Sequence, residues 1–255
     1  MRELKLMMSM SLDGFVSGPA GEIDWVFNGD QQAIASKVEM AWNASLHLTG
    51  SRTFKGMAGF WPTATSPFAA PMNQIPKAVF SIQGPAVLEA AAKALADAQA
   101  LITATPGGQL QAGAETWAQA DVASGGLADE VAKLKARGGK PIIAHGGAAF
   151  ARSLIAHNLV DEYVLGVYPI VLGKGVPIFA DLPAPRPLTL IGTKAFPSGF
   201  MAQTYRPAEG DKRRCMPACV KTGAASDAEP AQAEAWQVDT PDPINANAPI
   251  KSRRR

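Results

Sequence analysis

The sequence predicts an α/β fold in which a mostly parallel β-sheet carries helices and ends in an antiparallel edge. Short apolar runs of strand length alternate with segments of helical periodicity, and turn residues separate them. Two further strand-like runs, 188–195 and 200–206, flank a Pro-Ser-Gly turn near the end of the patterned region. This last pair predicts the antiparallel edge.

Each expected element follows from local signals. Ile34, Val38, Ala41 and Trp42 stand at helical spacing and predict a helix over 31–42. Pro85 opens an Ala-rich helix that a Pro-Gly-Gly segment ends after about residue 104. The other expected helices cover 127–136 and 148–156, and the other expected strands cover 4–10, 46–48, 77–81, 141–144 and 162–168.

Composition limits the classes of protein that the chain can belong to. Apolar residues make up 47% of the 255 residues and the net charge is +2, so we expect a folded chain without a strong field for nucleic acid. No window approaches the roughly 18 apolar residues of a membrane span, and the first apolar run is too short for a signal peptide. We therefore expect a cytoplasmic protein with no membrane partner. The two cysteines lie far from all three histidines, which argues against a zinc site.

The amino-acid composition of the sequence changes after residue 206. Residues 207–255 are rich in Ala, Pro and charged side chains and carry few large apolar ones. Such a segment cannot bury enough apolar surface to offset its ordering entropy. We predict one domain over 1–206 and a disordered tail over 207–255. The basic end of the tail is interpreted as a solvated terminus, with a nucleic-acid patch as the alternative.

Two junctions, each running from a strand through glycine into a helix, carry the chemistry. At the first, Gly50 ends a strand, and Ser51, Arg52 and Thr53 follow where a helix begins. Free N–H groups and the positive dipole end of a helix suit phosphate, and the guanidinium adds a bidentate donor.

At the second junction, Gly146 and Gly147 precede Ala148 and let the backbone approach a ligand closely. Two such junctions in one α/β chain favour a dinucleotide with several phosphates. The GxGxxG fingerprint and the P-loop pattern are both missing, so neither ordinary nucleotide fold is supported.

Several landmarks occur in a characteristic order along the chain. They are SLDGFV (Ser11–Val16), Asp24-Trp25, GSRTFKGM (Gly50–Met57), IPKAVFS (Ile75–Ser81) and HGGAAFARSLIAHNLVDEYVLGVYPIVLGKGVPIF (His145–Phe179). In this the sequence resembles the dihydrofolate reductase-like superfamily, and within it the group that shares the reductase domain of riboflavin biosynthesis. The resemblance implies a three-layer fold whose central mixed sheet has about eight strands with helices on both faces. It also implies NADPH as hydride donor and a homodimer.

The resemblance also implies roles for individual residues. The first junction would hold the 2′-phosphate and pyrophosphate, although Ser51 stands where an Arg is usual and Arg52 could supply the missing charge. Ser81 would contact the adenosine phosphate. The second junction, Gly146 to Ala148, would lie under the pyrophosphate and nicotinamide ribose. The residues expected near the nicotinamide and the substrate are Met8, Ser9, Val16, Trp25 and Phe54.

Three residues are candidates for acid–base catalysis. Dihydrofolate reductases place a carboxylate five residues after a Trp, the interval from Trp25 to Asp30 here. Such a group can help a heterocycle accept a proton, but Asp30 could equally cap the helix that begins at Gln31. Asp24 could face the pocket or cap a turn. His145 stands where riboflavin-pathway reductases usually carry Glu, and is either a ligand contact or a packed residue.

These features predict an NADPH-dependent oxidoreductase that transfers a hydride to a small heterocycle of pyrimidine or pteridine type. No metal site is expected. Two named options are 5-amino-6-(5-phosphoribosylamino)uracil reductase of the riboflavin pathway and dihydrofolate reductase. A non-catalytic nucleotide-binding sensor is the alternative from another class.

Overall fold

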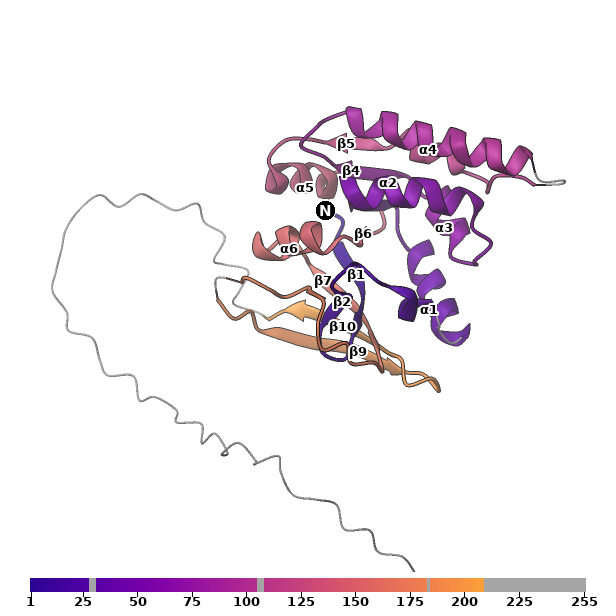
Figure 1. The fold of residues 1–255 in the computed structure, drawn as a ribbon. Helices are drawn as coiled ribbons and strands as arrows, with labels where there is room; N and C mark the ends of the chain where they lie inside the picture. The colour runs from indigo at the N-terminus through magenta and orange to yellow at the C-terminus, as the bar shows by residue number, and fades with distance from the viewer. Residues whose placement is uncertain (28–30, 105–107, 183, 209–255) are drawn as a thin grey trace, which may run out of the picture. The chain divides into compact units, whose positions relative to one another are not determined.

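The computed structural model describes residues 1–27, 31–104, 108–182 and 184–208 (Figure 1). Asp30 and the expected tail after residue 208 lie outside the described residues. The strands are β1 (Leu4–Ser11), β2 (Phe15–Ser17), β3 (Leu46–Gly50), β4 (Lys77–Phe80), β5 (Asp121–Ala123), β6 (Ile142–His145), β7 (Glu162–Tyr168), β8 (Val176–Pro177), β9 (Leu188–Ala195) and β10 (Met201–Pro207). The helices are η1 (Asp24–Val26), α1 (Gln31–Trp42), α2 (Ser51–Phe60), η2 (Trp61–Thr63), α3 (Ala69–Gln74), α4 (Ala86–Thr103), η3 (Ala114–Trp117), α5 (Leu127–Ala136) and α6 (Ala148–Ala156).

The main sheet confirms the predicted fold class. Its eight strands follow the order β5-β4-β3-β6-β1-β7-β10-β9. Neighbours from β5 to β7 pair in parallel, and β10 pairs antiparallel with both β7 and β9. The predicted antiparallel edge is therefore formed by β9 and β10 at the C-terminal end.

Helices cover both faces of this sheet. On one face, apolar side chains of α5 and α6 pack on β1, β3, β6 and β7. On the other face, α2, α3 and α4 bury Phe54, Met72 and Val87 with Val79 of β4. Helix α1 lies beside α3, and α2 runs beside α4 (Figure 1). The three-layer arrangement follows from alternation along each strand, because successive side chains point to opposite faces.

The strand order creates a switch point between β3 and β6. The chain leaves β3 through α2 for β4 on one side, and leaves β6 through α6 for β7 on the other. Right-handed crossovers in opposite directions place α2 and α6 on opposite faces. A crevice then opens at the carboxyl ends of β3 and β6, where α/β proteins bind ligands.

Some local predictions are wrong in detail. Trp42, expected on the buried face of α1, is 40% exposed, whereas Ala33 and Ala41 are buried. The apolar face of α1 is therefore rotated by about one residue from the predicted one. The last strand continues to Pro207, and the Ala208 N–H donates to the Pro187 carbonyl, so the described domain extends past residue 206. Among the described residues, no helix combines the length and the apolarity that crossing a membrane requires.

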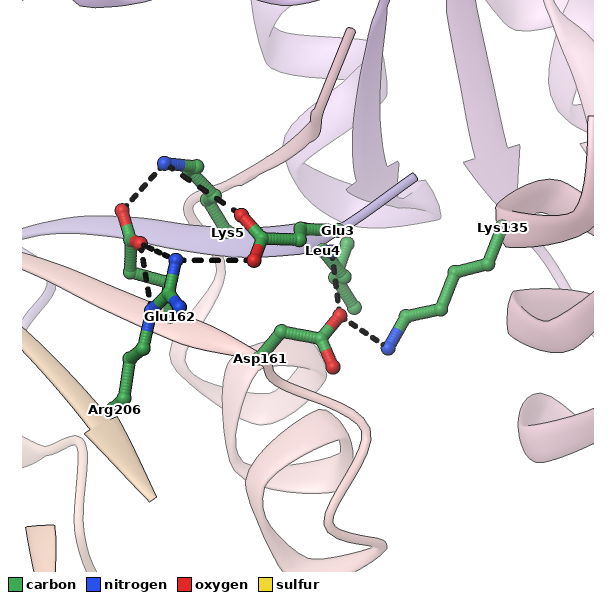
Figure 2. Close-up of polar contacts among 7 residues, drawn as sticks. All are labelled: Glu3, Leu4, Lys5, Lys135, Asp161, Glu162 and Arg206. Carbon is green, nitrogen blue, oxygen red and sulfur yellow. Dashed lines mark hydrogen bonds and ion pairs between the residues drawn. The ribbon is translucent and has the colours of Figure 1, made fainter. Parts of the chain in front are cut away.

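An ion network ties together the ends of three strands at the edge opposite the crevice (Figure 2). The Glu162 carboxylate lies 2.6 Å from Lys5 Nζ and 3.1 Å from Arg206 Nη2, and its side chain is only 7% exposed. Arg206 also pairs with Glu3 at 3.0 Å. Nearby, Asp161 accepts from the Leu4 N–H at 2.8 Å. These contacts fix β1, β7 and β10 relative to one another.

Replacement of Glu162 by Gln is expected to lower the free energy of unfolding by about 1–3 kcal/mol, because two cations lose a shared, nearly buried counter-charge. This expected loss of unfolding free energy is smaller than for a fully buried ion pair, because Arg206 is half exposed. Urea denaturation measures it. The control is Asp97→Asn, which breaks the exposed Lys93–Asp97 pair and should cost less than about 0.5 kcal/mol. Equal effects of the two substitutions would contradict a structural role for the network.

Candidate active site

A large cavity opens at the switch point between β3 and β6. Its volume is about 1400 Å³, more than the roughly 300–1,000 Å³ of a pocket for one small ligand. It is lined by the carboxyl ends of β1, β3 and β6, by the first turns of α2 and α6, and by one side of α1. The volume suits an extended ligand together with a second, smaller one.

The two glycine junctions meet at this cavity. Gly146 and Gly147 have φ values of +49° and +74°, and a Cβ on Gly147 would lie 2.5 Å from Thr53 Oγ1 on the first turn of α2. A Cβ on Gly50 would lie 2.8 Å from Phe150 Cβ on α6. The glycines therefore allow the N-termini of α2 and α6 to approach each other. Their free N–H groups form the kind of cradle that suits phosphate.

The charges of the lining favour anionic ligands. Its charged side chains are Lys37 on α1, Arg52 on α2 and Arg152 on α6, and the described lining contains no Asp or Glu. Arg152 was missed from the sequence, although it lies only four residues after Ala148, one helical turn into α6. Because both arginines accompany a helix N-terminus, each can pair with a phosphate. The cradle, the arginines and the volume fit a phosphorylated dinucleotide.

The structure brings most of the predicted site residues to this one cavity. Those that line it are Met8, Ser9, Val16, Gly50, Ser51, Arg52, Thr53, His145, Gly146, Gly147 and Ala148. They come from four separate stretches of the chain, which the parallel pairing of β1, β3 and β6 gathers at one edge.

Other predicted residues do not line the cavity. Phe54, predicted to contact the substrate, is fully buried and packs on Trp117 with ring centroids 5.4 Å apart, because α2 turns it into the core and away from the lining. Ser81 is buried, and its hydroxyl accepts from the Gln83 N–H. Trp25 packs edge-on against Tyr168 behind the lining residue Val26. Asp24 is exposed and also lies outside the lining.

His145 is held by a second histidine. His47 Nδ1 and His145 Nε2 lie 2.5 Å apart, and His47 Nε2 lies 3.2 Å from the Pro71 carbonyl oxygen. A carbonyl only accepts, so the hydrogen-bond network assigns the proton of His47 to Nε2. Nδ1 of His47 then accepts from Nε2–H of His145. This leaves Nδ1 of His145, in a ring that lines the cavity, as an acceptor for a ligand N–H or O–H.

Burial keeps both rings neutral. It lowers the pKa of His145 to about 3, and burial, followed by the repulsion that a second positive charge would meet from His145 and Lys77, lowers the pKa of His47 well below its usual value. Below about pH 6.5 these two histidines bind protons in the unfolded chain but stay unprotonated in the folded protein. Stability that is present above this pH is therefore lost as the pH falls toward 3.

Acidification from about pH 6.5 to about pH 5 should cost the protein about 2 kcal/mol through His145, and His47 should add a further loss of the same sign. His145→Gln removes one titrating ring, so its unfolding free energy should fall by about 2 kcal/mol less over that interval. Urea denaturation at both pH values measures the difference. His157→Gln, at an exposed position just after the end of α6, serves as the control for the loss of an imidazole. An unchanged pH dependence in His145→Gln would contradict the neutral pair.

Lys37 was not predicted from the sequence. It follows Ala33 by four residues and Ile34 by three, so it lies on the inward face of α1 and lines the cavity. Its Nζ donates to the Tyr168 hydroxyl at 2.5 Å. The sequence signal that could have identified it is a lysine at helical spacing from apolar residues, which places it on the inward face of the helix.

Comparisons with known proteins show what the chain and its fold are similar to. The uncharacterized protein YyaP of Bacillus subtilis is 26% identical over 204 residues, which cover 80% of this chain and 94% of YyaP. Among solved structures, a protein from Shewanella sp. PV-4 assigned to riboflavin biosynthesis has a TM-score of 0.56 at 20% identity and covers 81% of this chain and 99% of its own. A diaminohydroxyphosphoribosylaminopyrimidine deaminase/5-amino-6-(5-phosphoribosylamino)uracil reductase from Thermotoga maritima has a TM-score of 0.54 at 16% identity, over 81% and 57% of the two chains. These structures share the fold.

Fold and cavity together define an α/β protein with a ligand site at a topological switch point. The sequence profile of the RibD C-terminal domain matches residues 2–202, and the chain belongs to that family. The family resemblance predicted from the sequence is thereby confirmed.

Proposed function

We propose that the protein is an NADPH-dependent reductase of a small heterocycle. The observation that carries the proposal is the meeting of two helix N-termini and two arginines in a cavity large enough for two ligands. Arg52 and Arg152 with the N–H groups of α2 and α6 would bind the phosphates of the dinucleotide. Met8, Ser9 and Val16 would face its nicotinamide, which supplies the hydride when bound.

The family and the Thermotoga relative favour a riboflavin-pathway type of substrate, a pyrimidine such as 5-amino-6-(5-phosphoribosylamino)uracil. A pteridine of the dihydrofolate type would be expected to meet a carboxylate, and the described lining has none. Asp30, the candidate for that role, lies outside the described residues. We therefore place the pyrimidine first.

The direct test is NADPH binding by calorimetry, followed by NADPH oxidation with a panel of aminopyrimidines, pteridines and quinones. Binding with turnover of an aminopyrimidine is the expected result. Tight binding without turnover of any compound would favour the nucleotide sensor. No binding of NADPH or NADH would overturn the proposal.

A homodimer is part of the proposal. Strand β9 forms a free edge of the sheet within the described domain, and its Leu190 and Ile191 are about half exposed. Such an edge is commonly covered by another chain. Light scattering on the purified protein should give twice the chain mass, and a monomer at micromolar concentration would contradict it.

A further inference from the structure

Lys37 stands out among the groups that line the cavity. Its side chain reaches the wall from α1, away from the helix N-termini that carry Arg52 and Arg152. No ion pair of Lys37 occurs within the described part of the chain. Its Nζ lies instead 4.8 Å from the centre of the Tyr168 ring and 4.7 Å from that of Phe200. Aromatic faces partly stabilise a cation while they leave its counter-charge to be supplied by a ligand.

Tyr168 fixes the direction of the Lys37 ammonium. The Tyr168 hydroxyl donates its proton to the Val26 carbonyl at 2.8 Å and accepts from Lys37 at 2.5 Å. Ser9, at the end of β1, also hydrogen-bonds to it. Because the tyrosine proton is already engaged and Tyr168 is only 6% exposed, this residue positions the lysine and does not itself meet a ligand. Lys37 uses one of its three N–H groups on Tyr168, and two remain for the cavity.

The surroundings also prepare the ammonium to give up a proton. Burial lowers the pKa of Lys37 to about 8 and raises the pKa of Tyr168, so near neutral pH the lysine is charged and the tyrosine is not. Tyr168 of β7 is the titratable group that contacts Lys37 among the described residues. Asp24 of η1 is exposed, and neither α3 nor the β9–β10 turn contributes a charged contact to Lys37 there.

We infer that Lys37 is the proton donor of the site. The ligand atom that it meets is a carbonyl oxygen of the substrate, and negative charge develops on this oxygen as the substrate is reduced. This rests on the proposed reductase function. When a hydride adds to the carbonyl carbon, or to a carbon conjugated with it, the displaced π pair moves to the oxygen. That oxygen forms an O–H bond as one N–H bond of Lys37 breaks. The neutral amine then recovers a proton from water.

The inference specifies a substrate class. A ring with a carbonyl group, such as a pyrimidinone or pteridinone, offers the acceptor that Lys37 needs. A ring N–H beside it could donate to the bare Nδ1 of His145, which accepts. A cationic ring would face Lys37 with no described carboxylate in the lining. We therefore expect neutral or anionic carbonyl heterocycles to bind and cationic ones to be rejected.

The first experiment compares steady-state kinetics of wild type with Lys37→Met, Lys37→Arg and the control Lys93→Met, at an exposed lysine. With the panel compound that wild type reduces, Lys37→Met should lower kcat about a hundredfold while the dissociation constant of NADPH stays the same. Lys37→Arg should also lower kcat, because a guanidinium keeps its proton. In wild type, kcat should fall above about pH 8, and Tyr168→Phe should shift this alkaline limb. Unchanged kcat and an unchanged alkaline limb in Lys37→Met would overturn the inference.

A second measurement does not depend on turnover. Trace acetylation with acetic anhydride across a range of pH, read by peptide mass spectrometry, reports the proton affinity of each lysine. Lys37 should gain half its full reactivity near pH 8 and lose reactivity when a bound pyrimidinone covers it, whereas the profile of exposed Lys93 serves as the reference and should not respond to that ligand. A Lys37 profile like that of Lys93 would also overturn the inference. Failure of the proposed function looks different, since wild type would then bind no NADPH or would bind it and reduce no compound of the panel.

Discussion

Gly147→Ala is expected to lower the affinity for NADPH at least about tenfold. The residue has a φ of +74°, a region that costs an L-amino acid about 1–2 kcal/mol. A Cβ there would also lie 2.5 Å from Thr53 Oγ1, on the first turn of α2. Relief of this contact must turn the Thr53 hydroxyl away or move the start of α2 or α6. Either change, together with the strained backbone, disturbs the first turn of α2 where the phosphate is expected, and calorimetry with NADPH should detect the loss.

Gly138→Ala provides the matched control for backbone strain. Gly138 has a φ of +70° with no atom within 4 Å of an added Cβ, and it is not among the cavity residues. It should lose stability by about 1 kcal/mol and keep its affinity for NADPH. If folded Gly147→Ala bound NADPH as wild type does, the glycine junction would not be part of the site.

Arg52→Ala is expected to weaken NADPH binding by about 1.5–3 kcal/mol, the scale of a charge-assisted hydrogen bond, which is about ten- to 150-fold. NADH binding should change much less, because the assigned contact is the 2′-phosphate that NADH lacks. The guanidinium lines the cavity at the start of α2. Titration of both nucleotides against wild type and variant measures the selectivity.

Arg152→Ala is the matched comparison on the other helix. Arg152 lines the same cavity from α6, where the pyrophosphate is expected. Its loss should weaken NADPH and NADH binding to a similar degree. Equal losses of the two nucleotides in Arg52→Ala would contradict the 2′-phosphate assignment, and a selective loss in Arg152→Ala would transfer it to α6.

Much of the fold could be predicted because its signals are local. The bounds of α1, α5, α6, β7 and β9 match the predicted ranges, since caps, periodicity and apolar runs mark them within the segment itself. The two glycine junctions could also be found, because a glycine before a helix is visible in the sequence. The three-residue strand β5 was not predicted, as its Asp-Val-Ala run is too short to show a period.

The chemistry of the cavity depends on contacts that no local pattern shows. Lys37 meets Tyr168 131 residues away, and His47 meets His145 98 residues away. His145 was a candidate from the sequence, but its pairing with His47 requires that β3 and β6 lie side by side. Lys37 was missed because the predicted buried face of α1 was wrong by one residue. The observed face places this lysine on the inner side of the helix. Tertiary pairing therefore decided which polar residues share the site.

The network of Figure 2 also brings the two ends of the described domain together. Glu3 precedes β1 and Arg206 lies in β10, and the two side chains pair across 203 residues of chain at 3.0 Å. The chain thus enters and leaves this domain at neighbouring points, on the far edge from the ligand cavity. A domain with this geometry is expected to accept fusion to a partner at either end, and circular permutation through a short linker between those ends, because chain added there starts on the far edge from the mouth of the cavity.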